Sequence, residues 1–192
     1  MLTHEEMKQL MLAALEEAEC GMREGEVPIG CVLARPINSR IEIVGRGHNR
    51  VNALQRKIAH AEIITFENAG VSKEGKPPTL PLNATNIILV STLEPCVMCL
   101  GAAMEAGVSL VVYGLDAPAD NGTSRVKPPQ SPESSAPEII GQILASESRR
   151  MLEVWLKAND SAEQAKFVRQ LLSLTHTKRE HDEKREEDRK QG

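Results

Sequence analysis

The chain has 192 residues, of which 41% are hydrophobic and only 2% aromatic, and its formal net charge is −4. This length suits one domain with a short extension, and the apolar fraction can build a core of aliphatic side chains. The acidic balance counts against a large nucleic-acid partner, because dedicated nucleic-acid binders are more often basic. No run reaches the ~18 apolar residues that a membrane helix needs. The acidic, amphipathic N-terminus is unlike a secretory signal, so we expect a cytoplasmic protein.

The first part of the chain reads as a helix followed by a hairpin. Apolar residues recur at helical spacing over residues 4–22 and predict an amphipathic helix. Short apolar runs at residues 28–34 and 41–47 predict two strands that pair antiparallel. The turn between them would use Pro36, Asn38 and Ser39. Residues 48–58 then predict a polar, basic loop.

The central part has the pattern of a strand–helix–strand unit. Residues 59–70 predict a helix that stops at a glycine, and residues 71–81 a surface loop. The run Asn86–Thr92 is almost continuously apolar and β-branched, which is typical of a strand buried on both faces. A helix over residues 95–107 and a second buried strand over residues 109–115 follow. Such a unit is right-handed with parallel strands, so the fold class is α/β.

The last third predicts a long loop, a strand and two helices. Residues 116–137 hold five prolines, and this loop begins where a buried strand ends, a frequent place for ligand contacts as well as for plain surface loops. A strand over 138–144 and helices over 146–159 and 161–176 follow. We expect three parts: a folded domain at 1–158, a C-terminal helix packed on it at 159–176, and a charged, disordered tail at 177–192.

The strongest chemical signal is a pair of short motifs at two predicted helix starts. Cys96 and Cys99 stand at i and i+3 directly after a proline, where the helix dipole favours thiolates. A redox pair is the alternative, but a thioredoxin-like context is missing. His60 supplies a third ligand, as a catalytic zinc site requires, although a lone histidine is more often a core residue. Glu62, two residues further on, could take a proton from a zinc-bound water. His-x-Glu followed by Pro-Cys-x-x-Cys is the signature of zinc nucleobase deaminases.

Over residues 4–160 the chain resembles the cytidine and deoxycytidylate deaminase superfamily, closest to its tRNA adenosine, guanine and cytosine deaminases. The resemblance rests on EVPIGCVLA, GRGHNR, AHAEI and TLEPCVMCLGAAMEAGVSLVVYG. It implies a three-layer αβα sandwich with a mixed five-stranded sheet. It also implies one Zn²⁺ per chain held by His60, Cys96, Cys99 and a water, with Glu62 as the catalytic proton shuttle. A homodimer is implied as well.

The resemblance further implies a set of substrate-binding residues. Asn49 would hydrogen-bond the substrate ring, and the other contacts would come from Ile29, Ala61, Glu94 and Pro95. The implied reaction replaces an exocyclic ring amine by a carbonyl with release of ammonia. The enzyme is then a hydrolase that acts on the C–N bond of a cyclic amidine.

The sequence leaves the substrate open between a small nucleobase or nucleoside and an adenosine at the tRNA wobble position. Four basic residues near the expected pocket mouth could meet phosphates or form a solvated loop: Arg46, Arg50, Arg56 and Lys57. Three features depart from the tRNA enzymes, namely Arg56-Lys57-Ile58 before the Ala-His-Ala-Glu motif, the loop after Tyr113, and the acidic chain with no basic C-terminal helix. Asp116 or Asp120 could instead recognise an amino edge of a purine. A non-catalytic, zinc-stabilised partner subunit is a third reading, which Glu62 disfavours.

Overall fold

The computed structural model describes residues 2–38, 40–70, 79–81, 84–128, 130 and 134–175. Its elements, in chain order, are α1 (His4–Arg23), β1 (Gly30–Ile37), β2 (Arg40–His48), α2 (Val51–Leu54), α3 (Ala61–Gly70), β3 (Ile87–Leu93), α4 (Val97–Glu105), β4 (Val108–Leu115), β5 (Glu138–Ile140) and α5 (Ala145–Ala158). Residues 165–175 are also helical. The expectations for the loop at 71–78 and for the tail at 177–192 fall outside the described residues.

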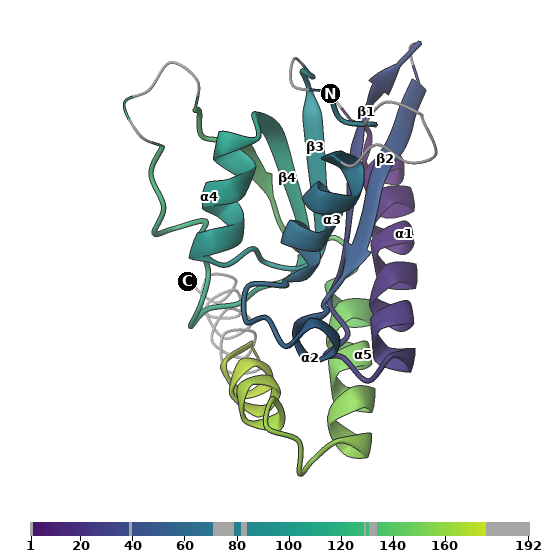
Figure 1. Ribbon diagram of the computed structural model, residues 1–192, viewed down its shortest axis with the longest axis vertical. Helices are drawn as coiled ribbons and strands as arrows, with labels where there is room; N and C mark the ends of the chain where they lie inside the picture. Colours follow the sequence, from purple (N-terminus) through teal and green to yellow (C-terminus); the bar gives the residue numbers. More distant parts are fainter. Residues whose placement is uncertain are drawn as a thin grey trace, which may run out of the picture.

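The five strands form one mixed sheet in the order β2-β1-β3-β4-β5 (Figure 1). The hairpin strands β1 and β2 pair antiparallel, as the sequence predicted, and β1 also pairs antiparallel with β3. The strands β3, β4 and β5 are parallel to one another. The predicted α/β class with a mixed five-stranded sheet is therefore confirmed.

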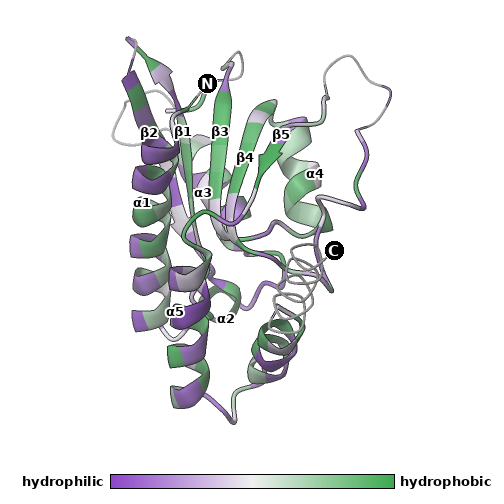
Figure 2. Cartoon of the chain, turned by 180° about the vertical axis from the view of Figure 1, so that it is seen from behind, coloured by the Kyte–Doolittle hydropathy of each residue, from purple (hydrophilic) through white to green (hydrophobic). Residues whose placement is uncertain are grey.

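Helices cover both faces of the sheet, and the strand residues alternate between the two helical layers. The side of the sheet with α1 and α5 faces the viewer in Figure 2, and α3 and α4 lie behind it. Val32 and Ala34 belong to the apolar cluster under α1. Cys31 and Leu33 belong to the cluster on the other side, with Ala61 and Leu100 of α3 and α4. This period of two makes the central strands apolar on both faces.

The structure corrects two sequence expectations in the first third of the chain. Pro36 lies inside β1, paired with Ile41, and not in the turn. Because β1 pairs with β3 only over Cys31–Ala34, Pro36 lies where β1 has a single neighbour and tolerates the missing N–H. The supposed loop at 48–58 contains the short helix α2. Its start is capped by Glu26, which accepts from the backbone N–H groups of residues 52 and 53 at 3.2 and 2.8 Å.

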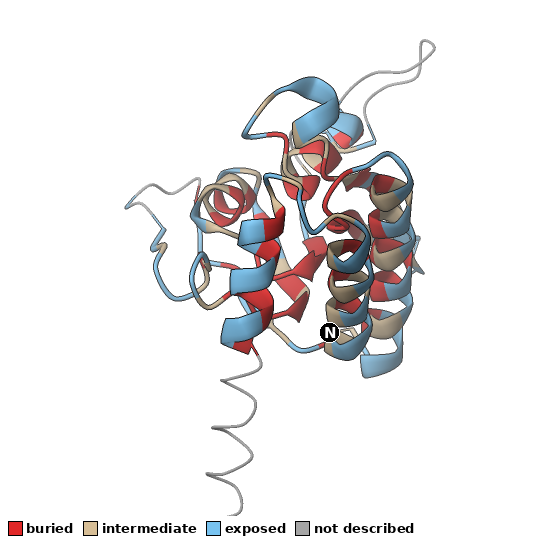
Figure 3. Cartoon of the chain, turned by 90° about the horizontal axis from the view of Figure 1, so that it is seen from below, coloured by how far each residue is buried: buried red, intermediate tan, exposed pale blue. Residues whose placement is uncertain are grey.

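The helix at 165–175 packs against the rest of the domain through one face. Ala165 and Val168 are completely buried, and Leu171 is 4% exposed. Figure 3, seen from below, shows buried residues on the inner side of this helix and exposed residues on its outer side. Within the described residues, no helix combines the length and the apolar character needed to span a membrane.

Candidate active site

The topology brings several chain segments to one end of the sheet. Because β1 runs antiparallel to β3, the residues that precede β1 lie beside those that follow β3, with Cys31 paired to Ser91. Asn49 follows β2, and its backbone N–H donates to the carbonyl of Ile29 at 3.0 Å. The helices α3 and α4 both begin at this end, so their N-termini converge on the same space. Side chains far apart in the sequence therefore meet here.

Three side chains at these helix starts have the donor set and spacing of a zinc site. The ligand atoms of His60, Cys96 and Cys99 all lie within 4.8 Å of one another. His60 Nδ1 is 3.6 Å from each of the two sulfur atoms. Tetrahedral zinc with Zn–N bonds of about 2.0–2.1 Å and Zn–S bonds of about 2.3 Å separates nitrogen and sulfur by about 3.5–3.6 Å. The residues present therefore fit a zinc ion, and the sequence-predicted ligand set is brought together.

The electrostatics of this trio suit a cation. Hydrogen bonds with Cys99 and with His60 lower the pKa of Cys96 to about 4. The Cys96–Cys99 hydrogen bond and burial raise the pKa of Cys99, because a second thiolate beside the first is unfavourable. The hydrogen bond with Cys96 raises the pKa of His60. A bound divalent cation would favour both thiolates and the neutral imidazole, since metal ligands bind deprotonated.

Glu62 lies beside the ligand trio and is almost completely buried, at 4% exposed. Burial raises the pKa of its carboxyl group, because a charged carboxylate loses hydration there. Ser91, on β3, donates its hydroxyl to Glu62 Oε1 at 3.1 Å. The carboxylate is therefore held in one orientation next to the thiols and the imidazole.

A cavity of about 260 Å³ opens over these residues. It is lined by Val27, Ile29, Asn49, Val51, Lys57, His60, Glu62, Leu93, Glu94, Cys96, Ala117, Asp120, Gln164 and Phe167. Apolar side chains thus form much of the wall, and Glu62 and two of the proposed zinc ligands, His60 and Cys96, are among the ionisable groups that complete it. A planar nucleobase is of suitable size for such a space.

The sequence-predicted substrate residues from the first half of the chain meet at this cavity. Asn49 and Ile29 line it. The side-chain oxygen of Asn49 accepts from the backbone N–H of Ala61 at 3.2 Å, which fixes the orientation of the amide. Ala61 itself is buried at the start of α3 and is not among the lining residues. Its part is to orient Asn49 in the folded chain.

Glu94 and Pro95 hold the loop that follows β4. The Glu94 carboxylate accepts from the backbone N–H of Ala117 at 2.8 Å and from the Thr123 hydroxyl. The carbonyl of Pro95 accepts from the backbone N–H of Gly122 at 2.7 Å. Glu94 also lines the cavity, whereas Pro95 is not among the lining residues.

The two loop aspartates differ in position. Asp120 lines the cavity, and burial raises the pKa of its carboxyl group. Asp116 is buried, accepts a hydrogen bond from the Tyr113 hydroxyl at 3.0 Å and does not line the cavity. The structure thus brings only Asp120, of these two candidates, to the site.

Three of the four basic residues considered for phosphate contacts face carboxylates of the same chain. Arg46 lies 3.6 and 3.5 Å from Glu16 and Glu17, and Arg56 lies 2.7 Å from Glu67. Arg50 is 3.9 Å from Glu24. Lys57 is exposed and lines the cavity, with no ion pair to another described residue. The mouth therefore carries less free positive charge than the sequence suggests.

Sequence reasoning missed several residues of the site, among them Ser91, Gln164 and Phe167. The sequence offered a clue to Ser91, because a hydroxyl side chain near the end of an otherwise apolar strand is conspicuous. It offered none to Gln164 and Phe167, because they lie about 100 residues from the zinc motif His60-Ala61-Glu62 and read there as ordinary helix residues.

Comparison with known proteins agrees with this geometry. A sequence profile of the cytidine and deoxycytidylate deaminase zinc-binding region matches residues 4–115. A tRNA-specific adenosine deaminase from Streptococcus pyogenes is 39% identical over 110 residues, which cover 57% of this chain and 63% of that relative. The chain thus spans less than two thirds of the length of the curated relatives it first matches, at 63% and 58%.

Two solved structures are similar in fold. One, from work on A-to-I editing by tRNA:A34 deaminases, is 28% identical with a TM-score of 0.56, and covers 74% of this chain and 98% of its own. The other is a guanine deaminase from Nitrosomonas europaea, 20% identical with a TM-score of 0.56, covering 77% and 83%. At that lower identity the likeness concerns the fold alone.

Proposed function

The chain belongs to the cytidine and deoxycytidylate deaminase zinc-binding family, and from this membership we propose that it is a zinc-dependent hydrolytic deaminase. It would replace an exocyclic ring amine by a carbonyl and release ammonia. The observation that carries this proposal is that the ligand atoms of His60, Cys96 and Cys99 lie within 4.8 Å of one another, while His60, Cys96 and Glu62 line one cavity.

The chemistry assigns each residue a role. A zinc ion held by His60, Cys96 and Cys99 would supply a Lewis acid that makes a water molecule nucleophilic at neutral pH. Glu62 takes one proton from the attacking water and gives it to the ring nitrogen, and it then moves the second proton of that oxygen to the departing amine. One C–O bond forms and one C–N bond breaks, so water and the ring amine become a carbonyl and ammonia. Asn49, with its oxygen fixed by Ala61, has its amide N–H₂ left to orient the ring.

The first substrate candidate is a small nucleobase or nucleoside of the guanine, cytosine or adenine type. The charge near the mouth supports it, because Arg46 and Arg56 each pair with glutamates of the chain, which offset part of the positive charge that would attract phosphates. Asp120 lines the cavity and could accept from an amino edge of the ring.

The second candidate is an adenosine at the wobble position of tRNA, giving inosine. It is favoured by the relative from Streptococcus pyogenes, which carries the name tRNA-specific adenosine deaminase at 39% identity. That likeness covers 57% of this chain. The two candidates undergo the same reaction. They differ in what is attached to the ring, which is at most a small sugar in the first and a whole tRNA in the second.

The deciding experiment is ammonia release by the zinc-loaded protein. The substrates are guanine, adenine and cytosine, their nucleosides and nucleotides, and a tRNA anticodon stem-loop. Glu62→Ala should keep zinc and lose turnover. The matched control is Glu67→Ala, on the same helix, because Glu67 is exposed and pairs with Arg56 outside the cavity.

Each outcome has a distinct meaning. Ammonia from a free base or nucleoside, lost in Glu62→Ala and kept in Glu67→Ala, supports a metabolic deaminase. Activity on the stem-loop alone supports the tRNA enzyme. Bound zinc without activity on any substrate contradicts the proposal and favours the partner-subunit reading. The homodimer implied by the resemblance stays a prediction, and sedimentation of the zinc-loaded protein would test it.

A further inference from the structure

The residues that line the cavity differ in exposure. This difference distinguishes a buried inner end of the cavity from an open mouth. Glu62 and Glu94 are 4% and 5% exposed, whereas Phe167 is 38% exposed. Lys57 is exposed as well. Asp120 is exposed too, so the open side of the cavity lies at Lys57, Asp120 and Phe167. A side chain at the mouth would contact the outer part of the substrate, which differs between a free base, a nucleoside and a tRNA.

One side of this mouth comes from the C-terminal helix, which lies outside the part of the chain that the family profile covers. That match ends at residue 115, and Gln164 and Phe167 belong to the segment at 164–175. The helix is anchored by other residues, since Ala165 and Val168 are completely buried. The Arg149 guanidinium on α5 also donates to the carbonyl of Leu172 at 3.3 and 3.2 Å. The Phe167 ring takes no part in these particular contacts.

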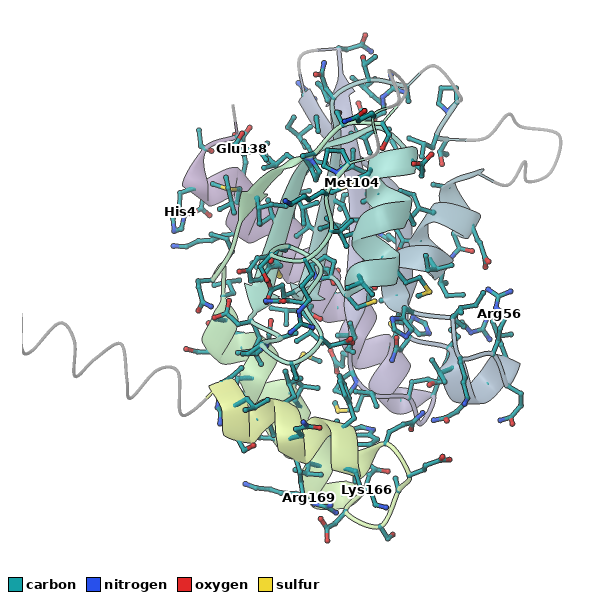
Figure 4. All side chains as sticks on the ribbon, turned by 90° about the vertical axis from the view of Figure 1, so that its left-hand side faces the viewer. His4, Arg56, Met104, Glu138, Lys166 and Arg169 are labelled. Atoms are coloured by element: carbon teal, nitrogen blue, oxygen red, sulfur yellow. The ribbon has the colours of Figure 1, made fainter. Side chains whose placement is uncertain are left out.

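A pair of amides ties the start of this helix to α2, on another part of the mouth. Asn52 Nδ2 donates to Gln164 Oε1 at 3.0 Å, and Gln164 Nε2 donates to Asn52 Oδ1 at 2.7 Å. The backbone N–H of Asn52 is itself held by the buried Glu26 carboxylate at 3.2 Å. Lys166 and Arg169 lie on the side of the helix away from the sheet (Figure 4). The reciprocal amide hydrogen bonds therefore fix the helix against α2, both along its axis and in its rotation about that axis. The position of Phe167 at the mouth is fixed with it.

A phenyl ring at the open side of this cavity is suited to packing against a planar ligand. The chain has only two phenylalanines, one tyrosine and one tryptophan. Among the described residues that line the cavity, Phe167 is the only one with a phenyl, phenol or indole ring. An exposed apolar ring is unfavourable in water, but it gains free energy when a planar base or the face of a sugar packs on it.

We propose that Phe167 is a specificity-determining residue that contacts the substrate at the cavity mouth, and that Asn52 and Gln164 are the pair that positions it. The ligand is a planar nucleobase, either free or with a sugar attached at its outer edge. This inference rests on the proposed deaminase function and adds to it a contact outside the family's zinc-binding region.

The test compares three substitutions in the zinc-loaded full chain. Phe167→Ala should raise KM by about 5- to 150-fold, the range expected for loss of one base–aromatic contact, with kcat little changed. Phe167→Tyr should restore most of the affinity. The matched control is Leu174→Ala, seven residues along the same helix and 36% exposed, which does not line the cavity and should leave KM unchanged.

Asn52→Ala tests the positioning pair without touching the substrate, because Asn52 does not line the cavity. It should raise KM by a smaller factor than Phe167→Ala does, with unchanged zinc content. The ratio of KM between base and nucleoside should also change. A fall in kcat with an unchanged KM would contradict the positioning role.

A binding measurement separates this inference from the proposed function. Equilibrium dialysis of guanine, adenine and adenosine against zinc-loaded Glu62→Ala, with and without Phe167→Ala, needs no turnover. Weaker binding in the double variant supports the contact even where no ammonia is released by the wild type. Equal binding, or KM values for Phe167→Ala that match those of Leu174→Ala, would overturn the inference while leaving deaminase activity intact. Failure of all three compounds to bind, together with no ammonia from any substrate including the stem-loop, would contradict both.

Discussion

Ser91 is the residue that orients the Glu62 carboxylate, through a hydrogen bond of 3.1 Å in a buried position. A hydrogen bond to a charged group contributes about 1.5–3 kcal/mol. Ser91→Ala removes the donor but leaves the proposed zinc ligands in place. We expect kcat to fall by about 10- to 100-fold with unchanged zinc content.

The measurement is ammonia release together with metal analysis of the purified variant. Ser109→Ala is the control, because the Ser109 hydroxyl on β4 donates to the carbonyl of Ile87 at 3.0 Å. Ile87 begins β3, and Ser91 lies toward the other end of that strand. A kcat for Ser91→Ala equal to that of Ser109→Ala would show that Glu62 needs no such support.

The four cysteines should differ in reactivity because the fold places them in different surroundings. Cys31 is completely buried, and burial raises the pKa of its thiol, so its reactive thiolate is rare. Cys20 is only partly buried. With zinc bound, we expect a disulfide reagent at pH 8 to label Cys20 alone. A chelator should then expose Cys96, whose pKa lies at about 4.

Peptide mapping by mass spectrometry assigns each label to its cysteine. Labelling of Cys31 in the folded protein, at a rate like that of Cys20, would contradict the burial on which this prediction rests.

At the scale of the elements, the close contact between β2 and α3 depends on glycine. A Cβ built on Gly47 would lie 2.8 Å from the backbone nitrogen of Thr65. Gly47→Ala should therefore push α3, and with it His60 and Glu62, away from the sheet. Overpacking of this kind costs about 1–3 kcal/mol. We expect a lower melting temperature and weaker zinc binding.

The matched substitution is Gly101→Ala in α4, where an added Cβ has no neighbour within 4 Å. An alanine in a helix interior is favoured over glycine by about 0.5–1 kcal/mol, so this variant should melt slightly higher. Thermal unfolding of both variants checks the pair. A Gly47→Ala protein as stable as the wild type would mean that the helix and the strand do not approach this closely.

At the scale of the whole molecule, the proposed zinc site links helices that are separated in the sequence. His60 precedes α3, while Cys96 and Cys99 belong to the start of α4. A ligand that binds only the folded state at 100 times its Kd adds about 2.7 kcal/mol of stability. For a protein of this size, that corresponds to a melting temperature about 5–10 °C higher.

Removal of zinc by a chelator should therefore lower the melting temperature by that amount, and added Zn²⁺ should restore it. Cys99→Ser, which weakens the site, should lose most of the response. An identical melting curve with and without chelator, in protein shown to contain zinc beforehand, would exclude a stabilising metal.

Much of the architecture was accessible from the sequence because its signals are local. The apolar run before Cys96 predicted a strand buried on both faces, and β3 is buried at every position. Helical periodicity predicted α1 to within one residue. Pro36 and the segment of α2 were misjudged, since their conformations depend on which strand ends where and on the distant Glu26 carboxylate.

The sequence by itself determined the fold class and the kind of chemistry, because ligand types at fixed short spacings on helix starts are enough to indicate a zinc site. Only the tertiary structure decided which loop aspartate reaches the cavity. Asp120 lines it, whereas Asp116 accepts a hydrogen bond from the Tyr113 hydroxyl away from it. The tertiary structure also decided that Phe167 and Gln164 line the cavity, where Gln164 exchanges amide hydrogen bonds with Asn52, 112 positions away. Contacts over such separations depend on the packing of the whole domain, which no local pattern of residues encodes.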